Sequence, residues 1–237
     1  RVLENSPVLS LQQAGSGWVA RTSKGQISTG KVILAVNGHA ESFGYYSRRL
    51  MHIYLYASMT RVLTKAETAA LGGQACWGFT PADPMGTTVR RISGIEGDRI
   101  LVRNRFTWAP QRTVDESRLK PIAQVHQQSF VSRFPQIAHV DMEYCWGGLL
   151  CLSRNNVPAF GELETNLYAA CCQNGLGTVQ GTLTGMLAAE LASGETSDHL
   201  ESVQAMPNPQ KLPAEPFASL GANAYMRWLE FRAGKEM

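Results

Sequence analysis

A glycine-rich stretch at residues 171–181, "CCQNGLGTVQG", holds the residues best placed for ligand chemistry. A strand-like run, "NLYAA" (166–170), precedes it, and an apolar helical pattern follows from about Thr178. A glycine turn between a strand and a helix exposes backbone N–H groups at the positive end of the helix dipole, which attracts negative charge. A pyrophosphate cradle would also need a further strand after the helix, with an acidic residue near its end. The following segment, "SGETSDHLESVQAMPNPQ", predicts no such strand, so the turn is interpreted either as purely structural or as a site for another negatively charged group.

A second glycine match, "GSGWVA" (15–20), has the G-x-G-x-x-A form of a dinucleotide fingerprint. That fingerprint requires a strand before it and a helix that starts inside it. Residues 18–22 predict a strand instead, so we interpret this match as a hairpin turn.

Two pairs of side chains with a spacing of two residues stand in the middle of the chain: Tyr54 with Tyr56, and Arg103 with Arg105. On a strand, this spacing puts both members of a pair on one face. A guanidinium group can hold a substrate carboxylate through two parallel hydrogen bonds. We therefore name all four as candidate substrate-binding residues. The alternatives are a solvated sheet face for the arginines and core or rim packing for the tyrosines.

Cysteine and histidine supply no recognisable catalytic or metal-binding pattern. Five cysteines are an odd number without zinc-finger spacing, as expected for reduced thiols, and no metal site is predicted. Cys171 and Cys172 are interpreted as buried, inert thiols. His39 and His52 are interpreted as structural rather than as general bases. The catalytic residues are left unassigned.

Composition and charge describe an ordinary globular protein. The 237 residues include 44% hydrophobic and 17% charged residues, enough for a core in one large domain or two small ones. The net charge of +3 is spread along the chain, which argues against a nucleic-acid partner. No stretch approaches the roughly 18 apolar residues of a membrane span, and no secretory signal is visible, so no membrane partner and a cytoplasmic location are expected. Because Arg1 leads directly into a strand without an initiator Met, we expect a piece of a longer protein.

The pattern along the chain predicts mixed elements. Residues 8–36 predict a small antiparallel meander that ends in the fully apolar strand "VILAV", and residues 53–105 predict a second, largely antiparallel sheet. A short helix at 64–71 interrupts this sheet, with Thr64 and Glu67 forming a capping box. The later expected elements are helices at 114–134 and about 178–192, strands at "MEYCWGG", "PAFGE" and "NLYAA", a loop at 206–216 and a last helix in "NAYMRWLEF". Val179, Leu183, Met186, Leu187 and Leu191 are expected to form the apolar stripe of the helix at 178–192.

Three distant blocks occur in an order that resembles one known group of proteins. They are "VILAVNGHA", "WGGLLCLSRNNVPAFGEL" and "NLYAACCQNGLGTVQGTLTGMLAAELASG". The chain resembles the D-amino-acid-oxidase-like flavoproteins, the FAD-dependent amine and amino-acid oxidoreductases that include sarcosine and glycine oxidases. Within them the run Ser153–Pro158 is most similar to the gamma-glutamylputrescine oxidases. The resemblance covers nearly the whole chain.

The resemblance implies an α+β fold, with a largely antiparallel substrate-domain sheet and helices, plus the C-terminal part of an FAD-binding α/β domain. The implied regions are 1–45, part of the FAD-binding domain with the meander; 46–145, the substrate-binding sheet; 146–195, the part facing the flavin ring; and 196–237, a tail.

The resemblance also implies where the FAD ring is held. Residues 174–177 match the family's Ser-Gly-His-Gly turn, whose helix N-terminus faces the pyrimidine edge of the isoalloxazine ring. Leu176 departs from this pattern, since many members carry His there. The implied cofactor-binding residues are Asn37, Gly38, Gly147, Gly148, Asn155, Asn174, Gly175, Leu176, Gly177 and Thr178. Covalent flavin through Cys151 is not expected, because the family's attachment position falls on Gly148.

The function implied is that of the C-terminal portion of an FAD-dependent oxidoreductase that oxidises a small amine or amino acid by hydride transfer to flavin. The family's G-x-G-x-x-G motif between strand and helix is not found in the sequence. We therefore expect an N-terminal FAD-binding segment, in the same polypeptide or as another chain, as the missing partner. The alternative is a non-catalytic binding or scaffold module that no longer binds FAD.

Overall fold

The computed structural model describes residues 1–237, and the chain forms two compact units. Unit 1 comprises residues 1–51 and 150–214, and unit 2 comprises residues 52–149 and 215–237. Both combine helices with sheets made mostly of antiparallel strands, so the expected α+β class is confirmed. The segment 196–237, which the sequence suggests as one tail, is divided between the two units at residues 214 and 215.

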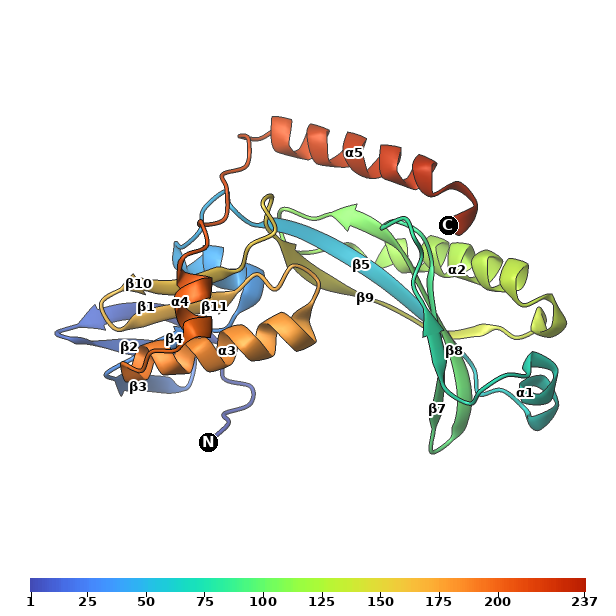
Figure 1. Ribbon diagram of the computed structural model, residues 1–237, viewed down its shortest axis with the longest axis horizontal. Coiled ribbons are helices and arrows are strands. Elements are labelled where there is room, and N and C mark those ends of the chain that lie inside the picture. The colour runs from blue at the N-terminus through green and yellow to red at the C-terminus, as the bar shows by residue number, and fades with distance from the viewer. The chain divides into compact units, whose positions relative to one another are not determined.

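Unit 1 contains two three-stranded sheets (Figure 1). The first is the predicted meander of β1 (Val8–Ala14), β2 (Gly17–Thr22) and β3 (Gly25–Thr29), in that order. "GSGWVA" forms the β1–β2 hairpin, as predicted, because its glycines are followed by a strand and not by a helix. The second sheet has the order β10 (Ala159–Glu164), β11 (Leu167–Cys171), β4 (Val32–Leu34), with β11 antiparallel to β10 and parallel to β4.

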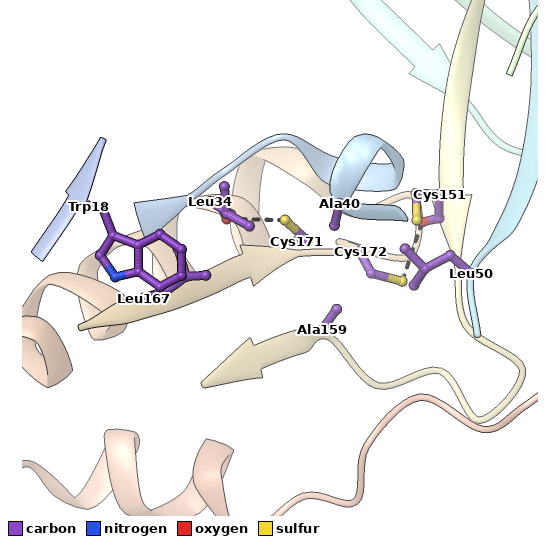
Figure 2. Packing of buried hydrophobic residues seen from close by; sticks show 9 residues of the cluster. All are labelled: Trp18, Leu34, Ala40, Leu50, Cys151, Ala159, Leu167, Cys171 and Cys172. Atoms are coloured by element: carbon purple, nitrogen blue, oxygen red, sulfur yellow. Dashed lines mark hydrogen bonds between the residues drawn. The ribbon is translucent and has the colours of Figure 1, made fainter. Parts of the chain in front are cut away.

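The core of unit 1 forms around β11, in which every residue is buried. Figure 2 shows how side chains from distant segments meet there: Trp18, Leu34, Ala40, Leu50, Cys151, Ala159, Leu167, Cys171 and Cys172. The Cys171 thiol donates to the Leu34 carbonyl at 3.1 Å, across the parallel β11–β4 pair. Both thiols predicted as inert are fully buried, Cys171 at the end of β11 and Cys172 directly after it in the same core cluster.

Two helices follow β11 in unit 1. Helix α3 (Gly177–Ser193) agrees with the prediction within a residue at each end, whereas α4 (Asp198–Gln204) was not predicted. The predicted apolar stripe of α3 is wrong as a single buried face. Leu187 is buried, but Val179 is 71% exposed and Met186 is 60% exposed, because they point away from β11. One exposed apolar face is therefore left on this helix.

Unit 2 is built on a five-stranded sheet in the order β6-β7-β8-β5-β9 (Figure 1). The strands are β5 (Met51–Thr60), β6 (Trp77–Phe79), β7 (Thr88–Gly94), β8 (Gly97–Trp108) and β9 (Met142–Leu152). The predicted capping box is present at the start of α1 (Lys65–Leu71), where Glu67 N–H donates to the Thr64 hydroxyl and Thr64 N–H donates to the Glu67 carboxylate.

Two longer helices lie against β8 in unit 2. They are α2 (Leu119–Arg133), preceded by a 3-10 turn at Glu116–Arg118, and α5 (Phe217–Ala233). Phe130 and Phe134 pack with Val89, Ile100 and Val102 to form the apolar core of the unit.

A buried polar chain runs beside that core. His126 Nε2 lies 3.2 Å from the Asn104 carbonyl, which can only accept, so Nε2 carries the proton and Nδ1 accepts from the Ser58 hydroxyl at 2.7 Å. The Asn104 side chain then donates to Thr87 at 2.9 Å. Burial lowers the pKa of His126 from 6.5 to about 4, so the imidazole is neutral near neutral pH.

A β-bulge interrupts the pairing of β5 with β8. Leu55 pairs with Phe106 and Tyr56 pairs with Asn104, so Arg105 has no partner in the register. Arg105 has φ +63°, in the left-handed region, as the extra residue of a bulge often does. The two-residue alternation of side chains is therefore broken at Arg105.

Candidate functional site

The glycine-rich stretch forms a tight turn from β11 into α3, as the sequence predicts. Cys172, Asn174 and Gly175 have φ values of +60°, +50° and +79°, so the chain turns through three left-handed positions. Leu176 N–H closes the turn by donating to the Gln173 carbonyl at 2.9 Å. Asparagine and glycine are the residues that tolerate this backbone region best, which explains the Asn174-Gly175 pair.

Two asparagine side chains hold this turn in place. Asn174 Oδ1 accepts from the Ser153 N–H at 2.8 Å, and Asn174 Nδ2 donates to the Val157 carbonyl at 3.1 Å. Asn37 Oδ1 accepts from the Cys172 N–H at 3.1 Å. Three segments that are far apart in the sequence are thereby joined at the start of α3. The amides of Asn37 and Asn174, which the sequence suggests as cofactor contacts, act in the structure as braces for the turn.

The turn leaves backbone donors free at the N-terminus of α3. The first bond within the helix runs from the Gln180 N–H to the Leu176 carbonyl at 2.9 Å. The N–H groups of Gly177, Thr178 and Val179 precede it and remain available to a ligand. Residues 175–179 are exposed, and a Cβ atom at Gly175 or Gly177 would meet nothing within 4 Å. An open, rigid backbone edge with free donors and a positive helix end fits the electron-rich edge of a flavin ring.

Other predicted cofactor residues of unit 1 have different surroundings. Asn155 holds the loop that follows α4, because Nδ2 donates to the Asn208 carbonyl and Oδ1 accepts from the Gln210 N–H, both at 3.1 Å. Gly38 is buried in the 3-10 turn Asn37–Phe43. The Ser153 hydroxyl, which the sequence does not single out, donates to the Val157 carbonyl at 2.7 Å and accepts from the Val157 N–H at 2.8 Å, completing the brace of the turn.

Gly147 and Gly148 lie on β9 in unit 2 and differ in what faces them. The Tyr54 ring occupies the space above Gly147, whereas a Cβ atom at Gly148 would meet nothing within 4 Å. The predicted cofactor residues are therefore divided between the units, with Asn37, Gly38, Asn155 and the 174–178 turn in unit 1.

The two candidate tyrosines lie side by side on β5, with ring centroids 5.3 Å apart. Tyr56 is fully buried, and its hydroxyl lies 3.0 Å from the Thr107 hydroxyl on β8. Tyr54 is only half-buried. Tyr56 is thus a core residue, and Tyr54 is the member of the pair with exposed surface.

The bulge at Arg105 interrupts the register that would fix its face, so a shared strand face for Arg103 and Arg105 stays a prediction. Arg105 pairs with Glu230 of α5 at 3.4 Å. Arg103 is exposed, pairs in register with Thr88, and donates to its hydroxyl at 3.1 Å. Arg90 stands two residues along β7 from Thr88, on the same face. Neither Arg90 nor Arg103 has a carboxylate partner, so this face carries uncompensated positive charge.

The chain is similar in sequence to curated oxidoreductases. Over 231 residues the chain is 26% identical to gamma-glutamylputrescine oxidoreductase of Escherichia coli (strain K12), covering 95% of this chain and 51% of that protein. It is 22% identical over 200 residues to the probable oxidoreductase OrdL of Haemophilus influenzae, covering 82% of this chain and 43% of that protein. The chain thus spans about half the length of these curated relatives.

Solved structures show the same fold. Glycine oxidase from Geobacillus kaustophilus matches with a TM-score of 0.68 at 17% identity, over 90% of this chain and 54% of that chain. L-proline dehydrogenase from P. horikoshii matches with a TM-score of 0.60 at 18% identity, over 87% of this chain and 54% of that chain. Residues 1–191 match the family described as FAD dependent oxidoreductase (DAO). This match shows that the chain belongs to the DAO family of FAD-dependent oxidoreductases.

Proposed function

We propose that this chain forms the substrate-domain and flavin-ring part of an oxidoreductase that oxidises a small amine or N-substituted amino acid. The observation that carries the proposal is the turn at 174–178, with free N–H groups of Gly177, Thr178 and Val179 on a rigid, open backbone. FAD, when bound, supplies the acceptor for the hydride that leaves the carbon beside the substrate amine.

The residues of the turn would stabilise negative charge on the pyrimidine edge of the flavin ring. Backbone donors that are already fixed in place need no reorganisation when charge develops, which is the condition for effective electrostatic stabilisation. Asn174 and Asn37 supply that fixity through their bonds to Ser153 and Cys172. Leu176 lacks the imidazole that many family members carry at this position. No backbone N–H donor is lost with it, so the turn would still stabilise negative charge on the ring.

The substrate carboxylate would be held by Arg103. Its guanidinium has one bond in the chain, to Thr88, so further N–H donors are free for an anion. The neighbouring Arg90 adds positive charge on the same face. Arg105 is engaged by Glu230, which leaves it a supporting role in the attachment of α5. A carboxylate-bearing amine therefore fits this face better than a simple alkylamine.

The phosphates and adenosine of FAD would be bound by a polypeptide segment outside these 237 residues, in cis or as another chain. Two observations support this. The curated relatives are about twice as long as this chain, and α3 exposes an apolar face of Val179, Leu183 and Met186 that nothing in unit 1 covers. A Rossmann-type segment packed on that face would bury it.

The alternative function is a binding or scaffold module that no longer binds FAD, which the lack of a G-x-G-x-x-G turn favours. Sequencing the genomic region around the coding sequence separates the two. Our proposal expects a strand, G-x-G-x-x-G and helix, in frame or in an adjoining gene, and stoichiometric flavin after expression of both parts together. A combined protein that is folded and free of flavin would support the scaffold module.

A further inference from the structure

Helix α5 is held to unit 2 by two polar side chains and by a small apolar stripe that includes the buried Ala233, and it carries large apolar side chains toward solvent. Ser219 accepts from the Trp108 indole at 2.9 Å, and Glu230 pairs with Arg105 at 3.4 Å, so both fix the inner side of the helix. Phe231 is 85% exposed and Phe217 is 70% exposed. We define the outer face of α5 by its exposed large apolar residues, Phe217, Leu220, Tyr225, Trp228 and Phe231. So many large apolar side chains on the solvent side are unusual for a helix packed on a domain.

The residues of the outer face also lie on one side of the helix. Residues 217, 220, 228 and 231 are separated by three, eight and three positions, so they fall within one side of an α-helix at 3.6 residues per turn. Tyr225 stacks on Trp228 with centroids 5.6 Å apart. Aromatic rings with a polar tip are the side chains that favour the boundary between water and lipid.

In the segment 215–237, the acidic and the basic side chains have different surroundings. Its acidic side chains are all bound by the protein: Glu230 by Arg105, Glu236 by the Asp83 N–H at 2.8 Å, and Glu215 by the Ser219 N–H at 3.2 Å. The basic side chains of the segment are exposed: Arg227 and Arg232 on α5, and Lys235 in the 3-10 turn Gly234–Glu236 that follows it. Arg232 has Asp83 at 3.4 Å and lies over the Trp228 ring, while Arg227 and Lys235 have no acidic partner.

From this geometry we propose that the outer face of α5 docks on an anionic phospholipid surface, with its aromatic residues in the headgroup layer and Arg227 and Lys235 on lipid phosphates. An amphipathic helix with aromatic and aliphatic groups on one face and flanking cations is the form that lies in the plane of a membrane interface. A second copy of this chain fits the face less well, because it would bring the same unpaired cations together. None of the helices has the length and hydropathy that a membrane-spanning helix requires. This proposal does not depend on the proposed enzymatic function, and it departs from the expectation, drawn from the sequence, of no membrane partner.

The test is co-sedimentation of the 237-residue chain with vesicles of phosphatidylcholine alone and of phosphatidylcholine mixed with phosphatidylglycerol. We expect binding to the mixed vesicles, weakening as salt is raised. Phe231→Ser should weaken it about tenfold or more. Arg227→Gln should weaken it about fivefold, as expected for one cation near an anionic surface. Because both side chains are exposed, neither variant should change the melting temperature appreciably.

A matched control is Ile95→Ser, since Ile95 is fully exposed in the β7–β8 turn and away from α5. Its vesicle binding should equal that of the unchanged protein. Absence of binding to the mixed vesicles would overturn the proposal, as would an equal loss in Ile95→Ser and Phe231→Ser. A concentration-dependent dimer that Phe231→Ser abolishes, with no vesicle binding, would instead assign the face to a second copy.

Discussion

The aromatic ring of Tyr54 lies across Gly147 on the neighbouring strand, and a Cβ atom at position 147 would come within 2.8 Å of ring atom Cδ1. Glycine is thus required at 147 by the packing of β5 against β9 within unit 2. Gly148, the next residue, faces open space. The two adjacent glycines therefore have different reasons to be glycine, and substitution separates them.

Gly147→Ala should lower the free energy of unfolding by about 1–3 kcal/mol, because the new methyl group overlaps the Tyr54 ring and the strand has to move. Gly148→Ala is the matched control and should change stability by no more than about 0.5 kcal/mol. Urea denaturation of both variants measures the difference. Equal losses would mean that the Tyr54 ring moves aside freely and does not fix position 147.

Gly175→Val tests the turn before α3. A β-branched side chain at φ +79° is strained and would stand in the open space that the flavin ring is proposed to use. The control is Gly194→Val, since Gly194 at the other end of α3 has φ +81° and the same open surroundings. Both should lose about 1–2 kcal/mol of stability. Only Gly175→Val should lose flavin from the complete enzyme, measured by flavin absorbance per polypeptide, and equal flavin content in both would make the turn purely structural.

The two strand arginines should behave differently on substitution. Arg103→Ala should raise KM for carboxylate-bearing substrates by about tenfold to a hundredfold, as expected for loss of a charge-assisted bond of about 1.5–3 kcal/mol, and leave carboxylate-free amines nearly unchanged. Arg105→Ala breaks a partly exposed ion pair with Glu230, so it should cost less than about 1 kcal/mol of stability and leave KM unaltered. Steady-state kinetics with both classes of amine distinguish them. A similar rise in KM for both substrate classes in Arg103→Ala would remove the carboxylate assignment.

The 237-residue chain purified alone should be colourless and bind FAD weakly or not at all. It presents backbone donors for the ring but no glycine-rich strand-to-helix turn for the pyrophosphate, since "GSGWVA" is a hairpin. Absorbance spectra and equilibrium dialysis with FAD measure this. A yellow protein with one flavin per chain would show that these residues suffice for the whole cofactor.

Stability should fall in mild acid because of His126. Its pKa is lowered to about 4 in the folded protein against 6.5 as its ordinary value, so the unfolded chain binds more protons in between. The contribution is therefore fully present above about pH 6.5 and is lost progressively as pH falls toward 4, by up to about 3 kcal/mol. Urea midpoints at about pH 7 and about pH 4.5 measure it.

His126→Gln is the comparison for this effect, since the amide cannot take up a proton in that range. The variant should be less stable at neutral pH but should lose less stability between the two pH values. If its pH dependence matched that of the unchanged protein, other groups would account for the acid sensitivity. The Arg61 guanidinium holds the pKa of the Glu67 carboxyl well below its ordinary value of 4.5, so Glu67 adds its own loss of stability mainly below that pH.

Features that depend on neighbouring residues in the sequence were predictable. The Thr64 and Glu67 capping box is formed within one helical turn, so residue types alone indicate it. The strand-to-helix turn at Asn174-Gly175 is equally local. Helix α4 was missed although its start has a local signal, the Ser197 side chain that accepts from the Leu200 N–H.

Features that depend on distant segments were not predictable. The bulge at Arg105 arises from the register between β8 and β5, which residue spacing along one strand does not contain. The roles of Asn37, Asn155 and Asn174 as braces depend on partners far away in the chain, so only their polar character was visible beforehand. His126 illustrates the same limit, because a histidine within a helical pattern gives no sign that a strand serine and a strand carbonyl will bury it.

The extra residue in β8 has an evolutionary consequence. Phe106, Thr107 and Trp108 pair in register with Leu55, Tyr54 and Ile53, and Arg105 takes up the additional position outside this register. Deletion of Arg105 would therefore remove the bulge and the ion pair with Glu230, while the Thr107 hydroxyl stayed beside Tyr56 and the Trp108 indole beside Ser219. A single-codon insertion or deletion at this position thus leaves the faces of the neighbouring side chains unchanged, so relatives could gain or lose this residue on the same framework.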